Sequence, residues 1–390
     1  MSAFPAVLVG GPPHSGKSVL LYAVSQALRD LGVAHYALRA CPDGEGDWSQ
    51  EAPPPEVRAI RIKGAWTPVW VDRLCRDIRN RHLPLLVDVG GRPTADQERL
   101  FDECTHAILL TKDEASHAEW QARLDRHALP LLADLTSRQE GESQVRSAAP
   151  ILSGVIAGLE RHAPVANPAL DALTAVLSQL FAPYQDHLRR RHLDAAPVEM
   201  AVDLDRLAVT LGWARPGAKM IWLPAHLPVV LDYLPAATSL AIYGRAPNWL
   251  IAALARLAHP AAFYSFDVRL GWAQAQPLRF GLSGPQAPLA VRSDEDADWL
   301  HVACRLPRDY IDYSQLDEAA VPLAPPAKGV ILSGKIPNWL TASLALTYAD
   351  APWLAVYQPM LQQQAIVVSA GAAAAVYPVG QLIPCRVTDA

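Results

Sequence analysis

The chain contains one motif twice, and this repeat constrains its fold more than any other feature. The segments are GRAPNWLIAALA, starting at Gly244, and GKIPNWLTASLA, starting at Gly334, 90 residues apart. Both place Pro-Asn-Trp-Leu in the same frame behind a glycine, which two unrelated amphipathic helices would not share by chance. This spacing is too long for a solenoid repeat and suits a small duplicated domain. We therefore predict a tandem pair, here called the first and the second copy.

The bulk composition predicts a soluble globular protein of two or three domains. The chain has 390 residues, of which 51% are hydrophobic and 19% charged, and its 34 prolines suit many short elements. A net charge of −5 argues against a surface that coats long nucleic acid, so an anionic ligand must meet a local site. The basic run at 189–192 is interpreted as a solvated helix end or linker, with a nucleic-acid contact as the less favoured alternative.

The cysteines indicate neither a disulfide framework nor a thiolate metal site, because they are odd in number, far apart and without a C-x-x-C pair. No apolar stretch reaches membrane-spanning length, and the N-terminus runs directly into a strand. We expect a reducing cytoplasm and no membrane partner. The five cysteines are Cys41, Cys75, Cys104, Cys304 and Cys385.

The N-terminal segment predicts a phosphate-binding loop. An apolar strand at 6–10 precedes G-x-x-x-x-G-K-S, and a segment of helical periodicity follows it. The glycines let backbone amides surround phosphate oxygens, the lysine reaches the β and γ phosphates, and the serine hydroxyl can ligate Mg²⁺. The candidate nucleotide-binding residues of this loop are Gly11, Ser15, Gly16, Lys17 and Ser18.

Strands and helices then alternate, which is typical of a parallel α/β sheet. We predict this nucleotide-binding, AAA/ATPase-like domain over residues 1–185. Asp88 ends a buried strand, where it would hold the metal together with Ser18, and Gly90-Gly91 would pass close to the γ-phosphate. Beyond the loop itself, the expected elements are strands at 35–39, 85–89, 107–111, 129–134 and 151–156 and a helix at 68–81.

Three acidic residues after the second strand have two interpretations. Asp43, Glu45 and Asp47 could position water or a second substrate at the edge of the sheet, or they could form a solvated turn. The residues themselves leave the identity of the base open.

Each copy is interpreted as a compact βαβ crossover. A strand ends in glycine, a turn places proline at the first helical position, an amphipathic helix follows, and a second strand returns. Amides at such a helix start can bind an anion, and a basic residue lies inside each turn; a well-capped structural helix is the alternative. The candidate substrate-binding residues are Gly244, Arg245, Pro247, Asn248, Gly334 and Lys335.

The copies differ in the residues that could carry catalysis. The first has His259, Asp267 and Arg269, whereas the second has alanine, glutamine and methionine at the matching positions 349, 358 and 360. Histidine can move a proton, arginine can stabilise a phosphoryl transition state, and aspartate can orient a group or ligate metal. We predict that only the first copy is equipped for chemistry.

Topology separates these candidates within one copy. In a βαβ unit, Asp267 and Arg269 lie at the carboxyl end of the second strand, while His259 lies at the end of the helix, about 17–20 Å away across the sheet. If they cooperate, we predict that His259 of one molecule faces the other two residues of another molecule. The alternative is a helix-capping histidine and a surface ion pair between Asp267 and Arg269.

The two copies resemble the Csx-three family of CRISPR-associated ring nucleases. That family is marked by G-R-x-P-x-W-L, by a histidine ten residues after the tryptophan, and by Y-D-P-R-L after the next strand. The first copy matches at 244–250, at His259 and at 267–270, with Val268 in place of proline. The second copy keeps the scaffold but not the catalytic identities. The resemblance covers residues 198–390 and extends to the N-terminal part, because members of this family occur fused to such P-loop domains.

The resemblance implies an α/β chain in which the P-loop domain precedes two ring-nuclease-like domains, at 198–292 and 297–390. It implies cleavage of cyclic oligoadenylates, chiefly the cyclic tetra-adenylate of type III CRISPR signalling. In that family two dimers sandwich the ring, so a stacked homo-oligomer is expected. ATP and Mg²⁺ are expected at the P-loop, and Mn²⁺ at the ring site. A sensor that binds the ring without cutting it, or a P-loop kinase, are the alternatives.

Overall fold

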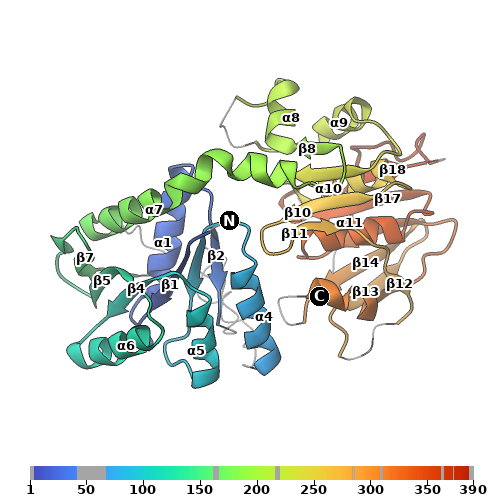
Figure 1. Ribbon diagram of the computed structural model, residues 1–390. Coiled ribbons are helices and arrows are strands. Elements are labelled where there is room, and N and C mark those ends of the chain that lie inside the picture. The colour runs from blue at the N-terminus through green and yellow to red at the C-terminus, as the bar shows by residue number, and fades with distance from the viewer. Residues whose placement is uncertain are drawn as a thin grey trace. The chain divides into compact units, whose positions relative to one another are not determined.

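The chain divides into two compact units. The computed structural model describes residues 4–41, 67–160, 167–215, 220–282, 284, 286–307, 311–361, 364–371 and 373–385. Contacts group Met1–Arg191 with Val268–Leu270 in the first unit, and His192–Asp267 with Gly271–Ala390 in the second. Both copies of the repeat therefore belong to one unit, and Figure 1 shows the elements of each.

A seven-stranded sheet forms the centre of the first unit, in the order β2-β3-β1-β4-β5-β7-β6. All neighbouring strands pair in parallel except the edge strand β6, which is antiparallel to β7. The strands are β1 (Ala6–Gly10), β2 (Tyr36–Arg39), β3 (Leu85–Asp88), β4 (His106–Thr111), β5 (Leu131–Arg138), β6 (Gln144–Ser147) and β7 (Leu152–Ala157).

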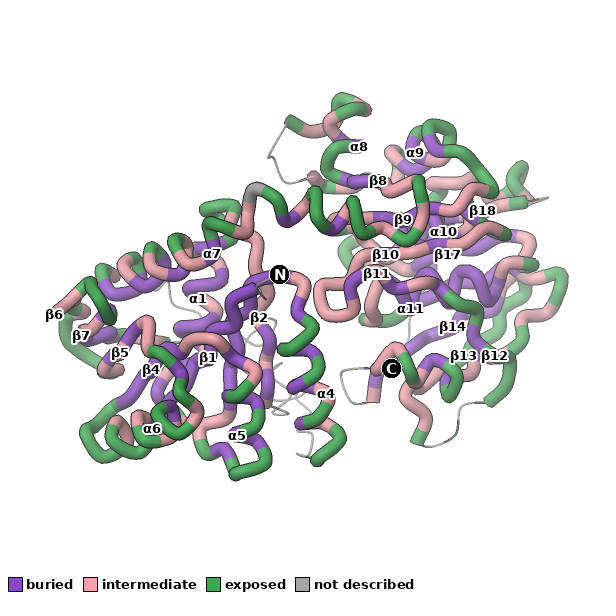
Figure 2. The backbone as a smooth tube through the Cα atoms, viewed as in Figure 1, coloured by how far each residue is buried: buried purple, intermediate pink, exposed green. Residues whose placement is uncertain are grey.

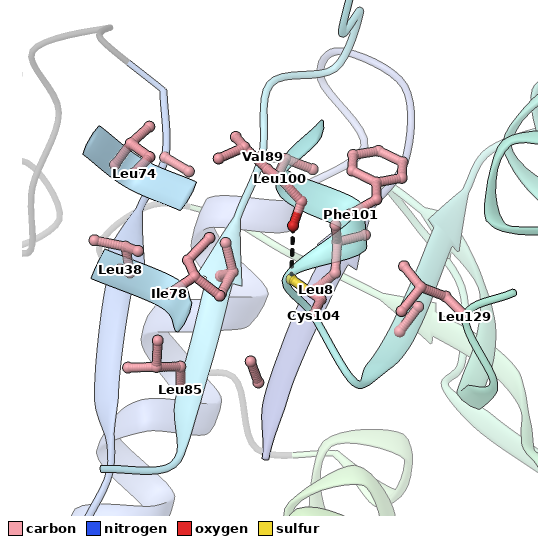
Figure 3. Packing of buried hydrophobic residues seen from close by; sticks show 14 of the residues in the cluster. Leu8, Leu38, Leu74, Ile78, Leu85, Val89, Leu100, Phe101, Cys104 and Leu129 are labelled. Atoms are coloured by element: carbon pink, nitrogen blue, oxygen red, sulfur yellow. Dashed lines mark hydrogen bonds between the residues drawn. The ribbon is translucent and has the colours of Figure 1, made fainter. Parts of the chain in front are cut away.

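Helices cover both faces of this sheet, because its inner strands are apolar on both sides. One apolar cluster unites the sheet with α4, α5 and α6, and part of it is seen in Figure 3. The other cluster unites the opposite face with α1 and α7. The helices are α1 (Lys17–Asp30), α4 (Pro68–Arg79), α5 (Ala95–Asp102), α6 (Glu114–Arg126) and α7 (Pro168–Asp194).

The predicted α/β architecture is confirmed, with differences at the far edge of the sheet. The strand expected at 129–134 starts later and continues to Arg138, because it pairs along its length with β7. The antiparallel strand β6 was not predicted, since its short polar sequence carries no strong alternation.

The first copy forms a four-stranded sheet in the order β11-β10-β9-β8. Strands β8, β9 and β10 are parallel, and β11 is antiparallel to β10. Its elements are β8 (Ala201–Asp203), α8 (Leu204–Thr210), the 3₁₀ turn η1 (Pro224–His226), α9 (Leu227–Tyr233), β9 (Leu240–Tyr243), α10 (Asn248–Ala258), β10 (Phe263–Asp267) and β11 (Gly271–Gln274).

The second copy forms a six-stranded sheet in the order β13-β14-β16-β17-β18-β19. A separate short ladder pairs β12 with β15. The elements are β12 (Arg279–Phe280), β13 (Ala290–Glu295), β14 (Trp299–Arg305), η2 (Tyr313–Glu318), β15 (Ala320–Val321), β16 (Gly329–Ser333), α11 (Asn338–Thr347), β17 (Trp353–Gln358), η3 (Pro359–Leu361), β18 (Gln364–Ala370) and β19 (Leu382–Pro384).

The two sheets share one topology. Strands β14, β16 and β17 are parallel and β18 is antiparallel to β17, which repeats the pattern of β8, β9, β10 and β11. Helix α10 connects β9 to β10 as α11 connects β16 to β17. The repeat seen in the sequence is therefore also a repeat of the fold.

The helices of the two copies pack against each other. Helix α10 also contacts β9 and β10 of its own sheet and β17 and β18 of the other, while α11 contacts β10. Most residues of both helices are buried, as Figure 2 shows. A helix that is apolar all round must be covered on all sides, and the partner copy supplies that cover. Among the described residues, no helix has the length and apolar character needed to cross a bilayer.

Candidate functional site

The predicted phosphate loop connects β1 to α1 as expected. Lys17 is buried and its Nζ donates to the carbonyl oxygens of Gly11 and Pro12, each at 2.8 Å. Burial lowers the pKa of Lys17, although nearby Asp88 acts in the opposite direction. The ammonium group therefore lies inside the loop, held by backbone oxygens.

Glycine is required at the loop for steric reasons. A Cβ atom at Gly11 would lie 2.0 Å from the carbonyl oxygen of Leu110, and Gly16 has a φ of 89°. Gly91 also approaches the loop, because a Cβ there would lie 2.4 Å from the backbone nitrogen of Pro13. The Ser15 hydroxyl is buried and has no hydrogen-bond partner among the described residues. An orphaned buried hydroxyl in such a loop suits a nucleotide ligand.

Asp88 lies beside the start of α1. Ser18 Oγ donates to Asp88 Oδ2 at 2.9 Å, and Arg39 Nη1 lies 3.2 Å from the same oxygen. Strand β3 is the direct neighbour of β1, which brings these groups together. A serine hydroxyl and a carboxylate in contact fit a Mg²⁺ ion that keeps most of its waters. The acidic residues Asp43, Glu45 and Asp47 lie outside the described residues.

The two repeat turns have the same local geometry. Gly244 and Gly334 have φ values of 112° and 142°, and the basic residues that follow them, Arg245 and Lys335, are exposed. The prediction that proline occupies the first helical position is wrong by one residue. Pro247 and Pro337 are the N-cap residues, with extended ψ values of 152°, so each helix starts at the asparagine.

Reciprocal hydrogen bonds join the two turns. Asn248 Nδ2 donates to the carbonyl oxygen of Ile336 at 3.3 Å, and Asn338 Nδ2 donates to that of Ala246 at 3.5 Å. The donors occupy matching positions of the repeat, and so do the acceptors. The copies are therefore related by an approximate two-fold axis that passes between the turns, as in an isologous dimer.

His259 lies apart from the other two catalytic candidates. His259 is the exposed C-cap of α10, whereas Asp267 ends β10, at the carboxyl edge of the sheet beside the Gly244 turn. Arg269 belongs to the first unit, where its Nη2 donates to the buried carboxylate of Asp77 on α4 at 2.5 Å. The structure therefore separates His259 from Asp267 within one copy, and it pairs Arg269 with Asp77.

A buried histidine that the sequence did not reveal lies behind the first turn. His192 ends the basic run, and the interpretation of that run as a solvated end is wrong for it, because it is buried. Its Nδ1 shares a hydrogen bond of 3.0 Å with the hydroxyl of Tyr243, and its ring packs on Phe266. Trp272 Nε1 donates to its carbonyl oxygen at 2.8 Å.

The second copy has a comparable pair. Ser333 precedes Gly334, and its hydroxyl shares a hydrogen bond of 2.8 Å with Nε2 of His301. Both side chains are buried. Position 360, where the first copy has its arginine, carries a methionine that is 87% exposed. No signal in the sequence links His301 to Ser333, because they come from different strands.

No group of three or more histidine, cysteine, aspartate or glutamate side chains suited to a metal ion occurs in the part of the chain that the structure describes.

The comparison with protein families bears on the second copy. Residues 305–384 match the family model of CRISPR-associated protein (Cas_csx3). This segment contains β16, α11, β17, β18 and β19. The second copy is thus similar to a CRISPR-associated Csx3 domain, and the first copy repeats its topology outside the matched residues. No curated protein sequence matches the chain.

Proposed function

We propose that the protein is an ATP-binding ring nuclease that cleaves a cyclic oligoadenylate, of which cyclic tetra-adenylate is the first candidate. One observation carries the proposal. The second copy matches the Csx3 family model, and the first copy repeats its topology while carrying His259, Asp267 and Arg269. Cleavage of the ring would switch off antiviral signalling.

The residues of the first copy would have separate roles. Arg245 and the amides of the Gly244 turn bind a phosphate group, and Asp267, beside that turn, orients the substrate or a metal ion. Arg269 stabilises the charge of the transition state, and His259 moves the proton. Because His259 lies at the other edge of the sheet, it completes the site of a second molecule in a stacked assembly.

The first unit would bind ATP with Mg²⁺. Lys17 would turn from the loop carbonyls to the phosphates, and Ser18 and Asp88 would hold the metal ion. The bound ion supplies charge neutralisation of the phosphates. We propose that nucleotide binding controls assembly or access to the ring site.

The decisive experiment incubates the full chain with labelled cyclic tetra-adenylate, Mn²⁺ and ATP and resolves the products. Linear products that disappear in His259→Ala support the nuclease. An intact ring that binds tightly contradicts cleavage and supports the second candidate. Absence of both binding and cleavage overturns the proposal.

The second candidate is a sensor that binds the ring without cutting it. The ion pair between Arg269 and Asp77 favours it, because an arginine held by a buried carboxylate is not available to a phosphate. Asp77→Ala separates the two functions. A nuclease keeps or gains activity when this partner is removed, whereas a sensor stays inactive.

A further inference from the structure

The turn of the second copy keeps a polar pair although the catalytic residues of that copy are gone. Ser333 and His301 are 7% and 5% exposed, and their hydrogen bond measures 2.8 Å. Burying two polar side chains gains little over an apolar pair of the same shape. Stability alone therefore gives no strong reason for this pair to be present.

The first copy also has a hydroxyl that is hydrogen-bonded to a buried histidine beside its turn, but different residues form the pair. There the residue before the turn glycine is Tyr243, and its hydroxyl shares a hydrogen bond with the buried His192. The two histidines come from non-equivalent elements, α7 and β14. Duplication of one ancestral histidine cannot produce both pairs. What the copies share is a hydroxyl, held by an imidazole, at the last residue of the central strand.

We propose that Ser333 contacts a phosphate group bound at the Gly334 turn and that His301 is the positioning residue behind it. This proposal rests on the proposed function, because the ring nucleotide supplies the phosphate. The second copy is then a working half of the binding site rather than a remnant. The approximate two-fold axis between the turns places this half opposite the half of the first copy.

The surroundings of His301 suit this role. Burial lowers its pKa, Asp294 on the neighbouring strand acts in the opposite direction and Arg292 lowers it further, so the net shift favours the neutral ring. A neutral imidazole that donates from Nε2 to Ser333 Oγ leaves the serine proton for a phosphate oxygen. The exposed Lys335, two residues on, adds positive charge.

His301 also lines a hollow of about 400 Å³. Asp294, Glu295 and Asp296 line it together with His301. The carboxylates around this hollow repel an anion. The phosphate contact is therefore assigned to the serine side of the imidazole, where the Gly334 turn lies.

The test compares Ser333→Ala with Ser333→Thr in the full chain and uses cyclic tetra-adenylate as the probe. We expect Ser333→Ala to raise Kd and KM about tenfold with kcat within about twofold, because a hydrogen bond to a charged group is lost. Threonine keeps the hydroxyl and restores both constants to within about twofold. The His301 imidazole signals in NMR shift on addition of the ring in the wild type but not in Ser333→Ala.

Ser343→Ala is the matched control. Its hydroxyl is also buried in the second copy, but it donates to the Trp339 carbonyl oxygen and accepts from the backbone N–H of Gln276. We expect it to lower stability and leave Kd unchanged. A folded Ser333→Ala protein with unchanged Kd, or with reduced kcat and unchanged KM, overturns this proposal while the nuclease stands. A wild-type protein that does not bind the ring overturns both.

Discussion

Asn248 and Asn338 donate to carbonyl groups of each other's turns, at 3.3 and 3.5 Å, so each copy holds the other through the same residue. Single protein chains rarely need such symmetry, but dimers use it routinely. The tandem repeat therefore builds within one chain the interface that two separate copies would form. The Gly244 and Gly334 turns, both proposed to bind phosphate, face each other across it, and Asp267 lies beside the first.

The proposed nucleotide site predicts a metal-specific effect of Asp88→Asn. The change removes the carboxylate charge of Asp88, which would hold Mg²⁺ together with the Ser18 hydroxyl. We expect the Kd for ATP with Mg²⁺ to rise at least about tenfold, and the Kd without Mg²⁺ to stay within about twofold. Isothermal titration measures both.

Asp134→Asn is the matched control for that experiment. Its carboxylate is paired with His117 at 2.8 Å and is half-exposed, so the same chemical change there should leave both affinities intact. An equal loss with and without Mg²⁺ in Asp88→Asn would contradict the metal role and indicate a damaged loop.

The separation of His259 from Asp267 predicts complementation between inactive proteins. His259→Ala and Asp267→Ala would each lack one side of the proposed composite site, but a mixed stack would contain an intact pair. We expect the mixture to cleave the ring at least about tenfold faster than either variant alone. Subunit exchange is verified by mass photometry. A mixture that assembles without regaining activity counts against a shared site.

The two turn glycines predict unequal costs for the same substitution. A Cβ at Gly334 would lie 2.1 Å from the carbonyl oxygen of Cys304, whereas at Gly244 the nearest atom, Leu204 Cβ, is 3.4 Å away. Gly244→Ala bears only the strain of a positive φ, about 1–2 kcal/mol. Gly334→Ala adds a backbone clash, and we expect it to cost about 2 kcal/mol more or to prevent folding. Urea denaturation gives both values; similar losses would show that the turns are not shaped as described.

His301 predicts a loss of stability in mild acid. Burial lowers its pKa below the usual 6.5, so on acidification the unfolded chain takes up the proton first. The stability that the buried neutral ring contributes is fully present above pH 6.5. The free energy of unfolding falls as the pH drops below that value. We expect His301→Gln to remove this part of the pH dependence.

The measurement is the difference in unfolding free energy between wild type and His301→Gln from pH 7.5 to pH 5. His106 and His226, whose pKa values are also lowered by burial, are present in both proteins and cancel. The wild type should lose more stability than the variant on acidification. A difference that is constant with pH would contradict the depressed pKa.

Local patterns were enough to predict the glycine-rich loop, the strands of the first unit other than β6, and the repeat. The phosphate loop lies on a strand, a turn and a helix that are contiguous in sequence, and Asp88 was placed by the rule that parallel strands end at one edge. The equivalence of β9-α10-β10 and β16-α11-β17 follows from the repeated motif G-x-x-P-N-W-L, which both segments contain. These features depend on neighbours a few residues apart.

Other features could not be predicted because they join distant residues. Arg269 meets Asp77 across 192 positions, and Ser333 meets His301 across 32. Nothing in a basic run distinguishes His192, which is buried, from Arg191, which is exposed. Such pairings depend on how completed elements pack, and periodicity within one element does not record that.

The sequence by itself determined that this chain has a glycine-rich loop with a lysine between its first strand and helix, and two copies of one βαβ unit, since glycine, lysine and the repeated Pro-Asn-Trp-Leu act through local geometry. Only the tertiary structure decided that the copies pair through their helices and asparagines, and that each turn is backed by a buried histidine. The physical reason is that close packing selects contacts between surfaces, and a surface exists only after its strands and helices have come together.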